Sequence, residues 1–553
     1  MIKEKLSVFI LKAIRNNWNI TALADYKGKS FTYGDVAGYI AHLHTRFEAC
    51  GIKKGDKIAL LGKNSAHWGI AYLAVITYGG TVVPILPDFK ANDVHHIINH
   101  SEARLLLAAD NLFDNLDPEK INRLLGTLSL NDFSVLHDGP GRILEKQAEK
   151  IEDLYQKKYP LGIQPDSLMF PELSNDTLGV ISYTSGTTGF TKGVMLPHNS
   201  LAANIVYANE NMPLNPGDKI VSFLPLAHAY GCAFEFLWPF TLGCHVTFLT
   251  KTPSPQIIIQ AFKEVKPRLV LAVPLIIEKI YKKQIIPALD KPAMKILLKT
   301  PGLKKIVHNK IRKKLVDVFG GNFHEIVIGG APLNKEVELF LKKIGFPYSI
   351  GYGMTECGPL ISYANWKNTK LESAGKVVDF LEMKIDSPDP ERIAGEILVK
   401  GENVMTGYFK NEEATKEALN SDGWLHTGDL GLLDNDDYVF IKGRSKSMIL
   451  GPSGQNIYPE EIEAMLNNKL YIQETLVRER KGVLQALIYP DYETIDKSSI
   501  SEQMFQQTLK NYKKEINEKL PAYMNIADID IVPEEFEKTP KKSIKRFLYT
   551  MDK

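Results

Sequence analysis

Short runs of β-branched and aliphatic residues alternate with helical hydrophobic patterns over most of this chain, and that alternation limits the fold more than any other feature. The clearest runs are KIAL at 57–60, TVVPI at 81–85, LGVISYT at 178–184, KIVSF at 219–223, LVLAV at 269–273 and EIVIGG at 325–330. Successive parallel strands need long crossover connections, which are usually helices. The alternation therefore predicts parallel sheets covered by helices, an α/β architecture.

The pattern changes after about residue 380, where short strands and turns replace the helical segments. EMKI at 382–385, GEILVKG at 395–401 and YVFIKG at 438–443 predict an antiparallel or barrel-like portion that closes the large domain. About a hundred residues with their own strand-and-helix pattern follow the polar run 442–446. We expect a large N-terminal domain over 1–444 and a small, mobile α+β lid domain over 445–553.

The amino-acid composition argues against several classes of protein. The chain has 553 residues, more than a single hydrophobic core usually supports, so we expect at least two domains. Its formal net charge of only +2 would not attract nucleic acid. Its four cysteines form no CxxC pair, which argues against structural zinc and suits a reducing compartment such as the cytoplasm. The N-terminal residues show no cleavage signature, so we expect no signal peptide.

One uncharged segment, 68–87, is nominally long enough to span a bilayer. Gly79 and Gly80 divide it, and Pro84 and Pro87 interrupt its second half. We therefore predict a helix over about 65–78 followed by the buried strand TVVPI, and no membrane span.

The segment 291–314 has nine Lys or Arg residues and no acidic residue, and aliphatic residues are interleaved with the cations. Such a surface suits anionic lipid headgroups or an anionic ligand, and it would place the protein peripherally at the inner face of a membrane. The alternative is a solvated helix face, which charge runs usually are.

A glycine- and threonine-rich loop, YTSGTTGFTKG at 183–193, follows the buried run LGVIS. Its glycines let the backbone turn and present N–H groups to an anion, and its hydroxyl groups add donors. Lys192 supplies a positive charge suited to phosphate. The Walker A spacing is not met, because Thr191 stands where its second glycine would be. The loop predicts a phosphate site of another kind.

This loop resembles the signature of the adenylate-forming superfamily, which includes acyl-CoA synthetases, luciferase and peptide-synthetase adenylation domains. The family pattern is close to YTSGTTGxPKGV, with Thr191 here in place of the usual proline. The resemblance covers nearly the whole chain, with further motifs in the family's order at 224–230, 329–333, 351–356, 423–431 and 441–444. It implies a two-domain α/β fold.

The resemblance also implies a reaction: a carboxylate attacks the α-phosphorus of ATP, and the acyl-adenylate is then passed to coenzyme A. ATP, Mg²⁺ and coenzyme A are the implied cofactor and co-substrates. Lys192, His228 and Glu356 are the implied catalytic residues, and Thr184 and Glu356 the implied metal contacts. The implied nucleotide-binding residues are Thr184, Ser185, Gly186, Thr187, Thr188, Gly189, Lys192, Gly330, Ala331, Pro332, Gly351, Tyr352, Gly353, Met354, Thr355, Asp429 and Arg444.

Individual roles follow from side-chain chemistry within that resemblance. Tyr352 is placed to stack on adenine, and Asp429 is suited to accept both ribose hydroxyl groups. Arg444 matches a position that contacts the ribose. His228 either donates to an α-phosphate oxygen or gates the carboxylate, although a lone histidine is more often structural. Lys446 matches the hinge about which the small domain rotates.

The C-terminal segment departs most from the family pattern, PKTPxGKIxR. Aligning 538–540 and 544–546 puts Ser543 where the catalytic lysine is expected, with Lys542 one place earlier. Serine cannot supply that charge. Either a shifted loop presents Lys542 or Lys541, of which we favour Lys542, or adenylation proceeds with a weaker clamp on the transition state.

The segments 265–274 and 278–281 resemble the long-chain fatty acyl-CoA synthetase branch, although Leu275 replaces an arginine common there. We therefore expect an AMP-forming long-chain fatty acid–CoA ligase. Two alternatives stay open: transfer to a carrier protein or activation of another carboxylate, and a weakly catalytic acyl- or nucleotide-binding protein, suggested by Ser543. A nucleic-acid partner is not expected, and a homodimer is left open.

Overall fold

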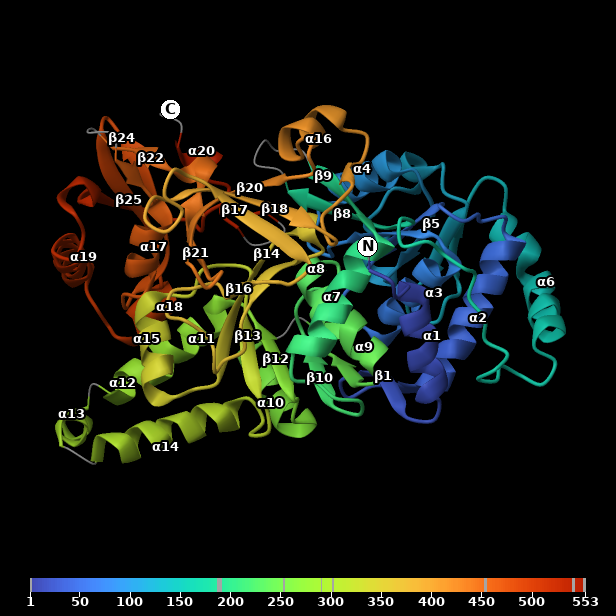
Figure 1. Cartoon of the computed structure of the whole chain (residues 1–553), viewed down its shortest axis with the longest axis horizontal. Coiled ribbons are helices and arrows are strands. Elements are labelled where there is room, and N and C mark those ends of the chain that lie inside the picture. Colours follow the sequence, from blue (N-terminus) through green and yellow to red (C-terminus); the bar gives the residue numbers. More distant parts are fainter. Residues whose placement is uncertain are drawn as a thin grey trace.

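The computed structural model describes residues 2–185, 191–251, 254–289, 291–300, 303–451, 455–539 and 543–550. Figure 1 shows the N-terminal elements in blue and cyan on the right, green and yellow elements in the centre and at the lower left, and most of the orange and red elements from the C-terminal part at the upper left. Within the described ranges, no helix combines the length and apolar character needed to cross a membrane.

The largest sheet has eight strands in the order β19-β9-β8-β4-β3-β5-β6-β7. Neighbouring strands among β8, β4, β3, β5 and β6 run parallel, as the alternation predicts. The strands are β3 (Lys57–Leu61), β4 (Thr81–Ile85), β5 (Ala103–Ala108), β6 (Gly126–Ser129), β7 (Val135–Asp138), β8 (Leu178–Ser185), β9 (Thr191–Pro197) and β19 (Gly407–Tyr408).

Strand β3 shows that this sheet is covered on both faces. Ile58 and Leu60 belong to a hydrophobic cluster with α2 (Tyr33–Ala49) and α3 (Ala66–Tyr78). Ala59 and Leu61 belong to another cluster, with α4 (Ala91–Ser101). Successive side chains of a strand point to opposite faces, so a strand buried on both sides reads as a continuous apolar run. The α/β prediction is confirmed.

The uncharged segment forms a core helix and strand. Ser65 accepts a hydrogen bond from the N–H of Trp68 and caps α3, which ends at Gly79 in the left-handed conformation (φ 90°). Almost every residue of α3 is buried, and β4 is buried throughout. A helix that is apolar all round belongs in a core, so the prediction for 65–85 is confirmed.

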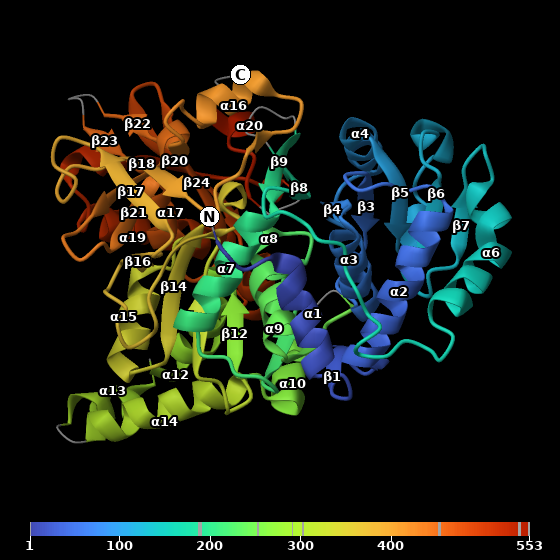
Figure 2. The same cartoon turned by 45° about the vertical axis from the view of Figure 1, so that its right-hand side comes forward.

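Two smaller sheets complete the α/β part. One has the order β10-β11-β1-β2, and the other has the order β12-β13-β14-β15-β16. Helices α10 (Pro255–Val265), α14 (Leu303–Val318) and α15 (Lys335–Ile344) pack beside the second sheet (Figure 2). Strands used below are β10 (Lys219–Ser222), β12 (Leu269–Ala272), β13 (Glu325–Ile328) and β14 (Tyr348–Gly353).

The portion predicted as antiparallel or barrel-like is a four-stranded antiparallel sheet, β17-β18-β20-β21. Within the described residues its outer strands do not pair with each other, so the sheet is open. Its strands are β17 (Leu381–Asp386), β18 (Gly395–Gly401), β20 (Leu425–Leu433) and β21 (Val439–Arg444).

The residues after Arg444 have hydrophobic clusters of their own. A three-stranded sheet, β24 (Ile472–Arg480), β25 (Val483–Pro490) and β26 (Ile526–Ile531), packs against α17 (Pro459–Asn467) and α19 (Glu502–Asn517). Both clusters in this part contain only residues from Ile449 onward. The three-residue turn η5 (Ser445–Ser447) links β21 to this part, and Lys446 is exposed on it.

Candidate functional site

The phosphate loop begins and ends on an antiparallel hairpin made by β8 and β9. Thr184 pairs with Lys192, and Ser185 pairs with Thr191. The Thr184 hydroxyl lies 3.5 Å from the carbonyl oxygen of Lys192 and donates to it. Gly186, Thr187, Thr188, Gly189 and the Ser185 side chain lie outside the described residues. The hairpin therefore fixes the two ends of the loop.

Lys192 and Glu356 meet through a tyrosine that sequence reasoning missed. The Lys192 Nζ lies 4.9 Å from the centre of the Tyr408 ring, and the Tyr408 hydroxyl donates to Glu356 Oε1 at 2.9 Å. Burial, and then the Glu356 carboxylate, raise the pKa of Tyr408, so its hydroxyl stays protonated. The only sequence signal was an aromatic residue after Gly407, and its partner lies 52 positions away.

Tyr408 reaches this position because β19 extends the sheet beyond β9. Tyr408 pairs with Val194, and the Met405 N–H donates to the Glu356 carbonyl oxygen at 2.8 Å. Glu356 is 9% exposed and lies in a single 3₁₀ turn, η4 (Thr355–Cys357), directly after β14. Tyr408 thus holds the Glu356 carboxylate and Met405 holds its main-chain carbonyl, and both come from one short segment.

Tyr352, Asp429 and Arg444 come from separate motifs and lie together. The Tyr352 hydroxyl donates to Asp429 Oδ2 at 2.7 Å, and Arg444 Nε lies 2.7 Å from Asp429 Oδ1. Asp429 and Arg444 face each other on neighbouring strands β20 and β21. Burial raises the pKa of Asp429; Arg444 and the Tyr352 hydrogen bond oppose that rise, and the Glu356 charge adds to it. Tyr352 lies in β14 and Glu356 in the turn η4 just after it, so one short segment carries a residue of each group.

The glycine-rich segments after β13 and within β14 lie side by side, because these strands are parallel neighbours. Gly330 has φ 84°, a conformation that a side chain strains. A Cβ on Gly353 would lie 2.1 Å from the Pro359 carbonyl oxygen. Ala331 and Pro332 are exposed beside them, whereas Thr355 is buried and Met354 is half-buried.

His228 ends a loop that two buried polar side chains hold in place. The fully buried Glu235 accepts hydrogen bonds from the N–H groups of Phe223 and Leu224, each at 2.9 Å. Asn64 donates to the Leu224 carbonyl at 2.7 Å and accepts from the Leu226 N–H at 3.0 Å. Burial raises the pKa of Glu235 well above its ordinary range, which favours its neutral form.

Glu235 belongs to a π-helical turn, Cys232–Leu237, that follows the short helix α8 (Ala229–Gly231). Such turns occur often at functional sites. The sequence contained the signal, a lone glutamate in the apolar run CAFEFLWPF, but the partners of that glutamate precede it by 11 and 12 positions.

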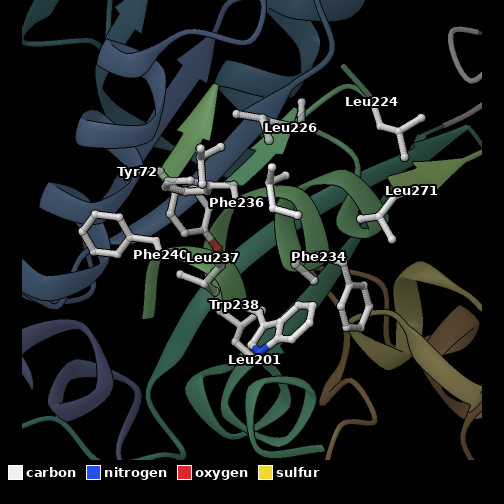
Figure 3. Packing of buried hydrophobic residues seen from close by; sticks show 14 of the residues in the cluster. Tyr72, Leu201, Leu224, Leu226, Phe234, Phe236, Leu237, Trp238, Phe240 and Leu271 are labelled. Atoms are coloured by element: carbon white, nitrogen blue, oxygen red, sulfur yellow. The ribbon is translucent and has the colours of Figure 1, made fainter. Parts of the chain in front are cut away.

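A small apolar cavity lies beside this loop. Its volume is about 20 Å³, room for roughly one water molecule. Figure 3 shows side chains from several elements converging here, among them Tyr72, Leu226 and Leu237. The lining is aliphatic apart from four residues, Tyr72, Ser182, Cys232 and Gly358. The cavity can receive an apolar group next to Ala227 and Ala229, the neighbours of His228.

Hydrogen bonds hold the C-terminal segment before and after Ser543, the residue that stands in place of the expected lysine. The Thr539 N–H donates to the Ser543 carbonyl oxygen at 2.8 Å. Lys538 and Ile544 form an isolated antiparallel β-bridge. Arg546 binds the Glu463 carboxylate through both terminal nitrogens. Lys541 and Lys542 lie outside the described residues. The hydrogen bond with Lys545 is the main cause that lowers the pKa of Glu537.

The described residues contain no group of three or more His, Cys, Asp or Glu side chains arranged to hold a metal ion. Mg²⁺ at nucleotide sites is commonly held by one or two carboxylates together with substrate phosphates. Glu356, whose carboxylate is held by the Tyr408 hydroxyl, matches that kind of ligand. The donor set therefore fits a magnesium ion that arrives with a nucleotide.

Known proteins resemble this chain along nearly its full length. 4-coumarate–CoA ligase 4 of Arabidopsis thaliana is 27% identical, with 95% of this chain and 87% of that protein covered. The long-chain-fatty-acid–CoA ligase FadD15 of Mycobacterium bovis is 28% identical, with 84% and 78% covered. The structure of the anthranilate CoA ligase AuaEII with anthranoyl-AMP superimposes with a TM-score of 0.77, at 19% identity, covering 99% of this chain and 96% of the other.

Residues 11–409 match the family described as AMP-binding enzyme, which is well over half of the chain. The matched range begins before α2 and ends just after Tyr408, so it spans the phosphate hairpin, the His228 loop and Glu356. The chain belongs to the AMP-binding enzyme family, within the adenylate-forming superfamily of acyl- and aryl-CoA ligases.

Proposed function

We propose that this protein is an AMP-forming acid–CoA ligase that uses Mg·ATP and a long-chain fatty acid. The observation that carries the proposal is the convergence of two groups, Lys192–Tyr408–Glu356 and Tyr352–Asp429–Arg444. The segment from β14 to η4 joins them, because it carries both Tyr352 and Glu356. One cluster provides charge for phosphates and the other provides acceptors for a ribose.

In the first step, a carboxylate oxygen of the acid attacks the α-phosphorus of ATP, and the bond to the bridging oxygen breaks. The products are an acyl-adenylate and pyrophosphate. Lys192 and the loop N–H groups over 184–189 hold the β- and γ-phosphates. Asp429 accepts from the ribose hydroxyls, Arg444 contacts the ribose, and Tyr352 lies against the base. Catalysis consists mainly of positioning and charge neutralisation.

Bound Mg²⁺ would neutralise phosphate charge, with Glu356 and the Thr184 hydroxyl as its protein contacts. Tyr408 orients the Glu356 carboxylate for that purpose. His228, between the cavity-lining residues Ala227 and Ala229, would donate to an α-phosphate oxygen or gate the carboxylate. Lys542 supplies the positive charge that Ser543 lacks.

In the second step, the thiolate of coenzyme A attacks the acyl carbonyl carbon, and AMP leaves. We propose that residues 445–553 act as a lid that turns about Lys446 between the two steps. Lys446 is exposed on η5, so its charge remains hydrated through such a rotation. A carrier protein as acceptor is the alternative within this chemistry.

The apolar lining of the cavity favours an acid with an uncharged tail. The long-chain relative supports a fatty acid. A second candidate is a compact aryl or short-chain acid, because a cavity of about 20 Å³ would have to open to take a long chain. The 4-coumarate relative is in keeping with that candidate.

The test is acid-dependent pyrophosphate release with Mg·ATP, across fatty acids of increasing length and aryl acids, with and without coenzyme A. Sustained turnover only with coenzyme A, highest for long chains, is the expected result. A maximum with an aryl acid favours the second candidate. A burst that coenzyme A does not accelerate points to another acceptor. Stabilisation by ATP without AMP formation for any acid overturns the ligase proposal.

A further inference from the structure

Helices α13 (Pro292–Lys299) and α14 form the lower edge of the molecule in Figure 1 and in Figure 2. One side of α14 packs toward α10 and α15 through the buried Val307 and Leu315. The opposite side faces solvent: Lys305, Ile306 and Asn309 are all exposed. The helix is thus anchored by one face and leaves the other free.

The free face carries charge of one sign. Lys304, Lys305, Lys310, Arg312, Lys313 and Lys314 are exposed, and the first acidic residue of α14 is Asp317. Among the described residues, no ion pair involves any of these six cations. Lys342 and Lys343 on the neighbouring α15 are exposed as well. Burial, then Lys343 and Lys304, lower the pKa of His308, as a local excess of positive charge requires.

Large apolar side chains are exposed among these cations. Ile306 is 62% exposed on α14, and Ile296 is 68% exposed on α13. Leu303 is exposed at the start of α14. Ile306, Lys310 and Lys313 are spaced four and three residues apart and share one side of the helix. A solvated helix face usually carries both signs of charge and no exposed isoleucine at its centre.

We propose that α13 and α14 form a docking surface for an anionic phospholipid bilayer. The lysine ammonium groups meet headgroup phosphates, and Ile296, Leu303 and Ile306 enter the boundary between headgroups and acyl chains. Charge complementarity selects this occupant. An acidic carrier protein would have to bring its acyl arm to the site, yet α14 lies at the lower edge of the molecule and the β8–β9 hairpin lies in its upper half (Figure 1).

The test is co-sedimentation of the full chain with phosphatidylcholine vesicles, with and without 30% phosphatidylglycerol, in the absence of ATP and acid. These conditions make the result independent of the proposed enzyme activity. We expect binding to the anionic vesicles alone, declining as salt rises from about 0.05 to 0.5 M, because exposed charges are screened.

Each lysine near an anionic surface strengthens binding about fivefold. The triple variant Lys305→Gln, Lys310→Gln, Lys313→Gln should therefore lower the partition coefficient roughly a hundredfold. Ile306→Ser should lower it about tenfold without changing the salt dependence, because it removes apolar insertion only. All four positions are exposed, so the variants should melt like the parent protein.

The matched control is Lys146→Gln, Lys150→Gln, Lys157→Gln on α6 (Ile143–Lys158), which removes the same charge from a helix that also carries acidic residues. It should bind vesicles like the parent. Equal binding to neutral and anionic vesicles, or an equal loss in the control, overturns the proposal. So does absence of sedimentation at low salt; a complex with an acidic acyl carrier protein that the α14 triple variant abolishes would then assign this surface to a protein partner.

Discussion

The side-chain amide of Asn334 donates a hydrogen bond to the main-chain carbonyl of Ala464 across 2.7 Å. Ala464 lies in the last turn of α17, where carbonyl groups lack partners within the helix. Lys282 donates to the Asn467 carbonyl of the same helix end at 3.1 Å. Two donors from the N-terminal part therefore hold the C-terminal part in this arrangement.

Asn334→Asp should weaken that arrangement. The aspartate still accepts from the Glu336 N–H and caps α15, but it presents a carboxylate to a carbonyl oxygen. The bond contributes about 1 kcal/mol. Its loss should raise about fivefold the fraction of molecules in which the C-terminal part has separated from the N-terminal part. Limited trypsin cleavage after the exposed Lys446 measures this population. Asn411→Asp, at the N-cap of α16 (Glu412–Ala418), is the control, and equal acceleration in both variants would contradict the interpretation.

Tyr408→Phe should raise the Mg²⁺ concentration needed for half-maximal pyrophosphate release, by about tenfold, because Glu356 loses the donor that orients it. Tyr348→Phe removes a similar buried bond, from Tyr348 to Glu338, at the start of β14 and not at the end that leads to Glu356. Both variants should lose about 1–2 kcal/mol of stability. If the Mg²⁺ requirement is unchanged in Tyr408→Phe, or changes equally in Tyr408→Phe and Tyr348→Phe, then Tyr408 does not orient Glu356 for Mg²⁺.

Lys542→Ala should reduce adenylate formation by about 10²–10³, the usual effect of removing one transition-state donor. Thioester formation from supplied acyl-adenylate should stay nearly intact, since that step has no developing charge on pyrophosphate. Lys541→Ala is the neighbouring control, and Ser543→Lys in the Lys542→Ala background should restore activity. Equal loss in both half-reactions would argue that Lys542 is structural.

Glu235→Gln should change how stability depends on pH. The pKa of Glu235 is raised from an ordinary value near 4.5, so the unfolded chain releases this proton while the folded protein keeps it. The stabilisation is complete below pH 4.5 and declines as pH rises toward the folded pKa, by up to about 1.4 kcal/mol per unit. Glutamine keeps the accepting oxygen but has no proton to release.

Urea unfolding of Glu235→Gln and of the parent protein at several pH values, followed by tryptophan fluorescence, tests this prediction. The difference in the free energy of unfolding between the parent protein and the variant should shrink as pH rises above about 4.5. Parallel pH profiles would show that Glu235 is ionised in the folded protein.

The sequence could predict what depends on local periodicity. The buried strands, the core helix α3 and the change to antiparallel structure near residue 380 followed from side-chain patterns. The loop at 183–193 was visible because glycines, hydroxyls and Lys192 are adjacent. In contrast, the hydrogen bonds of three side chains reach residues far along the sequence: 52 positions away for Tyr408, 160 for Asn64 and 130 for Asn334. No local sequence pattern predicts such contacts. The volume of the small apolar cavity depends on packing from many elements and was likewise beyond prediction.

The pairing of β19 with β9 also sets an order of events during synthesis. Tyr408 completes the edge beside Val194 only after more than two hundred further residues have been made. At 5–20 residues per second, the β9 edge stays unpaired for about 10–40 s on the ribosome. A strand edge left open for that long invites pairing with another chain. A nascent polypeptide halted before residue 407 would hold every residue of the phosphate loop, yet would be more prone to aggregate than to bind a nucleotide.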